Sequence, residues 1–80
     1  MFNIKDAVTI LKKKYNVIPV KYTMYNNDYL IYAYPPGTKN PDKVMSPWYI
    51  VDTKTKKVGP FSPIFDLEGF NEATRKMRSI

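Results

Sequence analysis

The chain has 80 residues, of which 44% are hydrophobic and 15% aromatic, and its formal net charge is +6. This length fits one domain, since domains commonly span ~50–250 residues, and the composition argues against disorder. Because cysteine and histidine are absent, disulfides, Ser/His/Asp and Cys/His triads and the usual Cys/His zinc sites are excluded. We expect a single domain over residues 1–80 that is not an enzyme and uses no metal or cofactor.

The sequence also bears on location. The stretch from Met1 to Asp6 lacks the basic and then apolar pattern of a secretory signal peptide. No apolar run approaches the ~20 residues that a membrane-spanning helix needs. We therefore expect a cytoplasmic protein without a membrane span.

A first helix is predicted over residues 4–15. Asn3 is a favourable N-cap, and Asp6 three positions later completes a pattern similar to a capping box. Hydrophobic residues follow at helical spacing, namely Ile4, Ala7, Val8, Leu11 and Tyr15. Asn16 is expected to end the helix in a left-handed conformation.

A hairpin is predicted after this helix. Residues 20–25 alternate in the manner of a strand, which places Lys21 and Tyr25 on one face. Asn and Asp tolerate positive φ, so residues 26–28 are predicted to form a turn. Residues 29–34 are apolar or aromatic at every position, which favours a central strand.

The second half of the chain supplies another hairpin and a helix. Residues 35–42 are a loop by composition. A strand is predicted at about 47–52, followed by a short strand over 57–61 that Gly59-Pro60 confines to a sheet edge. Asp66 is the expected N-cap of a second helix. The apolar stripe of that helix comprises Leu67, Phe70, Ala73 and Met77.

The predicted fold is a two-layer α+β sandwich in the order α-β-β-β-β-α. Hairpin connections make the sheet antiparallel. Each helix has one apolar stripe, so we expect both helices to cover the same face of the sheet.

The aromatic residues provide the candidate binding site. If the helices cover one face, the strand over residues 29–34 exposes either its odd-numbered or its even-numbered side chains, and the even-numbered set pairs more naturally with Lys21 and Tyr25. The candidate site then comprises Lys21, Tyr25, Tyr32, Tyr34 and Tyr49, with Trp48 expected in the core. The alternative is that these tyrosines simply pack on one another as cross-strand pairs.

We therefore expect a small protein-binding or regulatory module, since Tyr is enriched at binding hot spots. The alternative is a basic nucleic-acid-binding module that acts through exposed Tyr and its lysine-rich clusters, which are Lys12-Lys13-Lys14, Lys54-Lys56-Lys57 and Arg75-Lys76-Arg78. The expected partner is another protein, with nucleic acid as the second candidate, and the chain is a monomer or a homodimer. The segment Pro60–Phe65 is expected to tie the second helix to the sheet, and the alternative is an exposed apolar recognition loop.

One local pattern resembles a known family. Tyr49 and the stretch Val51–Val58 are similar to the strand-turn-strand of PepSY-type domains, with Lys56 in the place of the family's turn glycine. The resemblance covers about ten residues. It implies a small non-catalytic module of the kind linked to peptidase inhibition.

Overall fold

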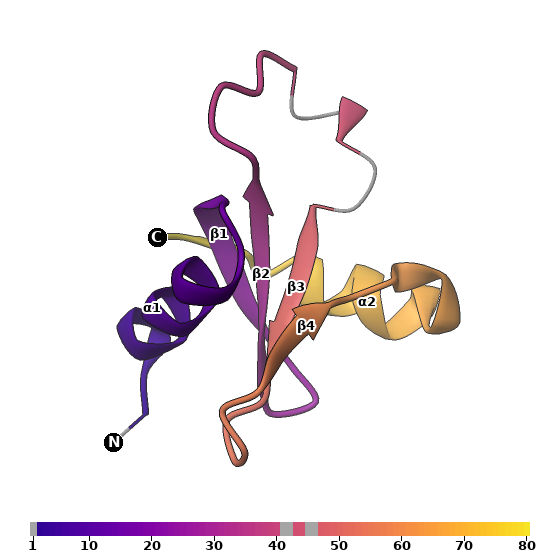
Figure 1. Ribbon diagram of the computed structural model, residues 1–80. Helices are drawn as coiled ribbons and strands as arrows, with labels where there is room; N and C mark the ends of the chain where they lie inside the picture. The colour runs from indigo at the N-terminus through magenta and orange to yellow at the C-terminus, as the bar shows by residue number, and fades with distance from the viewer. Residues whose placement is uncertain (1, 41–42, 45–46) are drawn as a thin grey trace.

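The computed structural model describes residues 2–40, 43–44 and 47–80. The described part of the chain forms an α+β domain with a five-stranded antiparallel sheet (Figure 1), which confirms the predicted fold class. The elements in chain order are α1 (Ile4–Lys14), β1 (Ile18–Tyr25), β2 (Asp28–Tyr34), β3 (Trp48–Val51), β4 (Val58–Pro60), the 3-10 helix η2 (Pro63–Phe65), α2 (Leu67–Thr74) and β5 (Arg78–Ser79).

The strand order in the sheet is β4-β3-β2-β1-β5, so β2 is central and β4 lies at an edge, as predicted. The fifth strand was not predicted. The second helix ends at Thr74 instead of continuing through Met77, and the chain returns to pair Arg78 with Tyr22 of β1. The predicted loop residues 41–42 lie outside the described residues.

The capping box of α1 is confirmed. The Asn3 side chain accepts a hydrogen bond from the Asp6 N–H, and the Asp6 carboxylate accepts one from the Asn3 N–H, both at 3.1 Å. The predicted left-handed Asn16 is wrong, since Asn16 is not among the positive-φ residues. The helix ends one residue earlier because Tyr15 is already extended, while its N–H still donates to the Leu11 carbonyl.

The β1–β2 hairpin turns through Asn26 and Asn27, with φ of 49° and 67°. Two central residues with positive φ define a type I′ turn, whose twist matches that of the flanking strands. The strands are longer than predicted at this hairpin, because β1 begins at Ile18 and β2 at Asp28.

The helix α1 covers the sheet face that carries the odd-numbered residues of β2 and β3. Ala7 and Leu11 of α1 are fully buried in a cluster with Ile31, Ala33 and Val51. This is the main hydrophobic core of the molecule.

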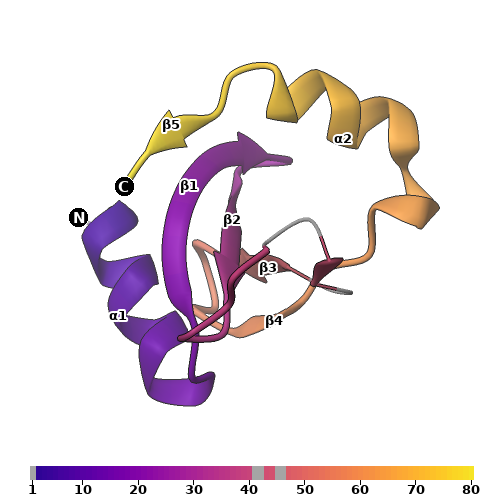
Figure 2. The same ribbon diagram turned by 90° about the horizontal axis from the view of Figure 1, so that it is seen from above.

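The expectation that both helices share one face is wrong, because α2 lies on the face opposite α1 (Figures 1 and 2). The Thr23 hydroxyl donates to the Ala73 carbonyl, and the ring of Phe70 lies 4.8 Å from that of Trp48. The physical reason is in β2, where Leu30 and Ile31 point to opposite faces and both are fully buried. A strand that is apolar on both faces needs a cover on each.

Replacing Asn27 with Ala should lower the free energy of unfolding by ~1–2 kcal/mol, because a left-handed conformation costs a residue with Cβ that much unless it is Asn or Asp. Asn27→Gly is the matched control and should lose little stability. Urea unfolding of both variants checks this expectation, and equal loss in the two would contradict the type I′ assignment.

Candidate functional site

Four of the five predicted binding residues share one face of the sheet. Lys21 lies opposite Tyr32 in the β1–β2 register, and Trp48 lies opposite Tyr32 on the other side. Tyr25 and Tyr34 follow on the same face by the two-residue period of strands. We call this surface the aromatic face, which comprises Lys21, Tyr25, Tyr32, Tyr34 and Trp48.

The expected places of Tyr49 and Trp48 are exchanged. Tyr49 lies opposite Ile31, and its ring is 5.0 Å from that of Tyr15, so it packs under α1. The alternation along β3 was predicted, but the side facing α1 was not. Val51 is fully buried in the main core, so its side of β3 faces α1. Tyr49, two residues away, lies on the same side as Val51, and Trp48 therefore faces the aromatic face.

Aromatic rings form a continuous series across this face, mostly in tilted or edge-to-face pairs of the preferred kind. The centroid distances are Tyr25–Phe61 5.1 Å, Phe61–Phe70 6.2 Å, Phe70–Trp48 4.8 Å, Trp48–Tyr32 5.0 Å and Tyr32–Tyr34 6.1 Å. The tyrosines of the series are half-buried. They therefore pack on one another, as the alternative expected, and also keep part of each ring in contact with solvent.

An open cleft of about 310 Å³ remains where α2 leaves the aromatic face uncovered. It is lined by Lys21, Tyr32, Trp48 and Met77. The Tyr32 and Trp48 rings meet at 70° and form two aromatic walls. Met77 adds an adaptable thioether, and Lys21 adds an ammonium group. We call this hollow the aromatic cleft, and it suits a flat or apolar group that carries a hydrogen-bond acceptor.

The Tyr25 hydroxyl ties the other end of the aromatic face to α2 by donating to the Asp66 carboxylate. The Gly69 N–H donates to the same carboxylate, which makes Asp66 the N-cap of α2, as predicted. These two donors hold the pKa of Asp66 below its ordinary value, the Tyr25 hydroxyl having the larger effect. The same hydrogen bond raises the pKa of Tyr25.

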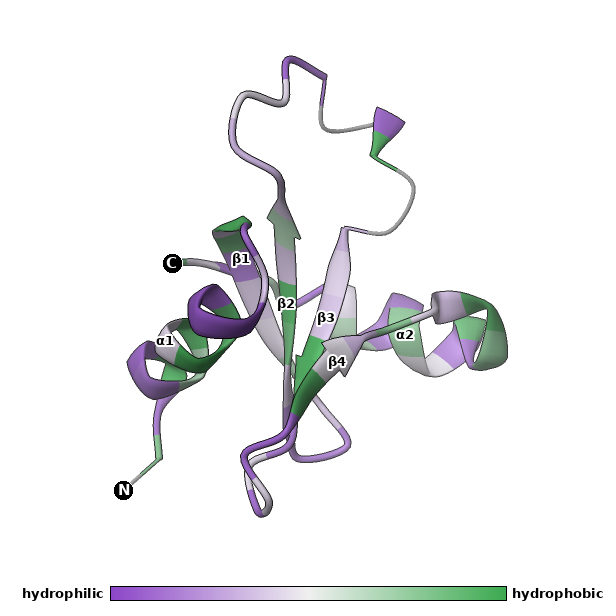
Figure 3. Cartoon of the chain, viewed as in Figure 1, coloured by the Kyte–Doolittle hydropathy of each residue, from purple (hydrophilic) through white to green (hydrophobic). Residues whose placement is uncertain are grey.

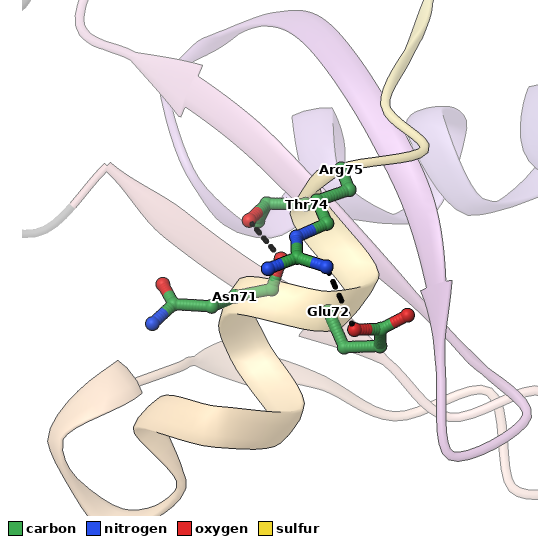
Figure 4. Close-up of polar contacts among 4 residues, drawn as sticks. All are labelled: Asn71, Glu72, Thr74 and Arg75. Carbon is green, nitrogen blue, oxygen red and sulfur yellow. Dashed lines mark hydrogen bonds and ion pairs between the residues drawn. The ribbon is translucent and has the colours of Figure 1, made fainter.

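The outer side of α2 is polar. Arg75 forms an ion pair with Glu72 at 3.4 Å, and the Thr74 hydroxyl donates to the Asn71 carbonyl (Figure 4). Both members of the ion pair are largely exposed, so it contributes little to stability. The polar side faces solvent, while Phe70 and Ala73 face the sheet.

The described carboxylates of the turns and caps have structural partners. Asp52 accepts the N–H groups of Thr55 and Lys54, which lower its pKa. Asp28 accepts the Thr53 N–H, and the Asp6 carboxylate accepts the Asn3 N–H in the capping box of α1. Among residues 2–40, 43–44 and 47–80, no group of three acidic side chains is placed to hold a metal ion.

Two of the basic clusters, Lys12–Lys14 and Lys54–Lys57, lie away from the aromatic cleft. The third, Arg75–Arg78, follows α2 and includes Met77 of the cleft lining. Lys14 at the end of α1 donates to the Val58 carbonyl, and the Lys56 ammonium lies 5.8 Å from the centre of the Phe2 ring. Both contacts join the N-terminal segment that contains Phe2 and α1 to the β3–β4 hairpin, on the sheet face opposite the aromatic face. Lys21 is the cation that lines the aromatic cleft.

The chain matches no protein-family model, and neither the search of curated proteins nor that of solved structures finds a match. None of the helices in the described ranges is long and apolar enough to cross a membrane.

The sequence analysis missed two residues of the aromatic cleft, namely Trp48, which lies on the aromatic face and not in the core, and Met77. Trp48 was assigned to the core because large apolar residues are usually buried. Met77 was assigned to the helix, although α2 ends three residues earlier. The alternation of β3 was the available signal, since it separates Trp48 from the buried Val51.

We expect the contact between α2 and the sheet to weaken in acid. The pKa of Asp66 is lowered in the folded chain, so its stabilising effect is complete above the ordinary Asp range and is lost as the pH falls through and below about 4. Trp48 fluorescence, which reports on the Phe70 contact, should change over this range. Asp66→Asn retains a capping side chain but no longer titrates, so it should abolish this change, whereas Asp52→Asn should leave it in place.

Tyr49→Ala should destabilise the fold by ~3–5 kcal/mol, the usual loss for a large aromatic residue removed from a core. Tyr34→Ala, at the solvent-facing end of the ring series, should cost ~1 kcal/mol. Thermal unfolding of the two variants measures the difference. Equal losses would contradict the assignment of these tyrosines to different faces.

Proposed function

We propose that the protein is a small non-catalytic module that binds another protein through the aromatic cleft. The observation that carries this proposal is the grouping of Tyr32 and Trp48 beside the exposed Lys21. Tyr and Trp dominate binding hot spots, because they bury a large area and lose few rotatable bonds.

The cleft has room for one or two side chains of a partner rather than for a whole domain. The aromatic walls and Met77 accept an apolar or flat side chain. The Lys21 ammonium is then available to a carboxylate or a main-chain carbonyl of the bound segment. An exposed segment with one acidic residue beside an apolar one matches these groups.

Protein is favoured over nucleic acid by the distribution of charge. A nucleic-acid groove follows the phosphates with several cations, whereas, among the described residues, Lys21 is the one cation that lines the aromatic cleft. Two of the three basic clusters lie on the other face of the sheet, at the end of α1 and in the β3–β4 turn.

The resemblance to PepSY-type domains points to the same class of function. Lys56, which stands in place of the family's turn glycine, has a φ of 63°, a conformation that glycine adopts without strain. We extend the proposal to a regulatory role on a partner enzyme, of the kind that this resemblance implies.

Affinity capture from the native cell followed by calorimetry with the purified partner tests the proposal. Tyr34→Ala, Tyr32→Ala and Lys21→Glu should each weaken binding by about tenfold or more, the effect of losing a hot-spot residue. Lys13→Glu makes the same charge change on α1 and should leave the affinity unchanged.

Circular dichroism of each variant is the control for folding. Unchanged partner binding by folded Lys21→Glu and Tyr32→Ala variants would overturn the proposal. Binding to single- or double-stranded nucleic acid that weakens steeply with salt and is lost in Lys13→Glu would instead support the alternative module.

A further inference from the structure

The chain exposes large apolar side chains where η2 leads into α2. Ile64 is 72% exposed, Phe65 90% and Leu67 57%. Figure 3 shows hydrophobic residues at this outer end of α2. Contiguous apolar surface of this kind on a small domain marks an interaction site. We call these three residues the apolar knob.

The apolar knob is held in place by its neighbours. Phe61 before it packs against the rings of Tyr25 and Phe70. Asp66, within the knob sequence, accepts hydrogen bonds from the Tyr25 hydroxyl and the Gly69 N–H. The knob is therefore presented in a defined conformation. The segment Pro60–Phe65 was expected either to tie α2 to the sheet or to form an exposed recognition loop. Phe61 has the first role, whereas Ile64 and Phe65 are exposed.

A complementary hollow lies at the other end of the molecule, between α1 and the β1–β5 edge of the sheet. Its volume is about 290 Å³, and its lining is mainly apolar: Ile4, Lys5, Val8, Tyr22, Ser79 and Ile80. A cavity of ~150 Å³ with apolar walls accommodates a benzene ring. This hollow, which we call the terminal groove, is therefore large enough for the ring of a Phe side chain.

The charges around the two surfaces have opposite sign. Asp66 and Glu68 flank Phe65 and Leu67 in the sequence of the knob. Lys5 lines the terminal groove, and Arg78 precedes Ser79 at its edge. In a chain with a net charge of +6, an acidic rim around the most exposed apolar residues is a local exception. This acidic rim disfavours binding of the knob to an anionic membrane and favours its binding to an apolar hollow with basic residues at its edge.

We propose that the apolar knob of one copy inserts into the terminal groove of a second copy. Knob and groove lie at opposite ends of the molecule (Figure 2), so a chain does not fill its own groove. The contact is heterologous, because different surfaces meet in the two copies. It therefore adds copies head to tail, either into a closed ring or into an open chain.

This inference goes beyond the proposed function and is independent of it. The aromatic cleft is lined by Lys21, Tyr32, Trp48 and Met77, none of which belongs to the knob or the groove. Loss of self-association and loss of partner binding are thus separate results.

Sedimentation velocity on two variants and their mixture tests the contact. The unmodified chain should associate as its concentration rises to about 1 mM, which is the weak end of specific binding. Phe65→Asp removes the knob and Ile80→Asp disrupts the groove at an exposed position, so each variant alone should sediment as a monomer. An equimolar mixture should form a dimer and nothing larger, because it contains one intact knob and one intact groove.

Each other result overturns the proposal. If the unmodified chain is monomeric at these concentrations, the contact does not exist. If that monomer binds phosphatidylcholine vesicles in a way that depends on Phe65, the apolar knob binds a membrane instead. Self-association of Ile80→Asp alone would indicate a knob-to-knob dimer. Circular dichroism should show that both variants remain folded, because Phe65 and Ile80 are exposed.

A charge exchange provides a second test. Lys5→Glu and Glu68→Lys should each weaken self-association severalfold, and the chain that carries both reversals should regain it. Lys13→Glu is the matched control outside the groove and should retain self-association. If the double reversal is as weak as the two single reversals, the proposed pairing of knob and groove is wrong.

Discussion

The structure depends on one constraint, which is that the central strand β2 is apolar on both faces. Leu30 faces one side of the sheet, Ile31 and Ala33 face the other, and all three are fully buried. Burying one such side chain is worth ~1.5–3 kcal/mol, a large part of the ~4–12 kcal/mol expected for a domain of 80 residues. The chain must therefore place a helix on each face, and it does so with its first and last quarters.

The two helices cover the sheet to different extents. This difference leaves the aromatic cleft and the apolar knob open to solvent. The helix α1 contributes the fully buried Ala7 and Leu11, whereas α2 has no buried residue. The shorter helix covers the aromatic face only in part, so the rings of Tyr32 and Trp48 border an open cleft. Phe65 at the end of η2 and Leu67 in the first turn of α2 remain 90% and 57% exposed.

Local signals in the sequence predicted most of the elements, but not their arrangement. The capping box at Asn3, the turn at Asn26 and Asn27 and the edge position of β4 all depend on near neighbours in the chain, and all are confirmed. The side of β3 that faces α1 depends on distant packing, which is why Tyr49 and Trp48 were exchanged. The two-residue β5 has no periodicity from which to predict it. The lysine and the even-numbered tyrosines of the site were placed together correctly because strand alternation in a hairpin fixes them.

The absence of buried residues in α2 has a consequence for motion. The described contacts that attach this helix are the Phe70 ring, the Thr23–Ala73 hydrogen bond, the Asp66 cap and the short β5 pairing. Segments with few buried contacts open at lower free energy than the whole molecule unfolds. We expect amide hydrogens of α2 and β5 to exchange with solvent before those of α1 and β2. If α2 detaches in this way, it uncovers the rings of Trp48 and Tyr32 while the sheet and α1 stay folded.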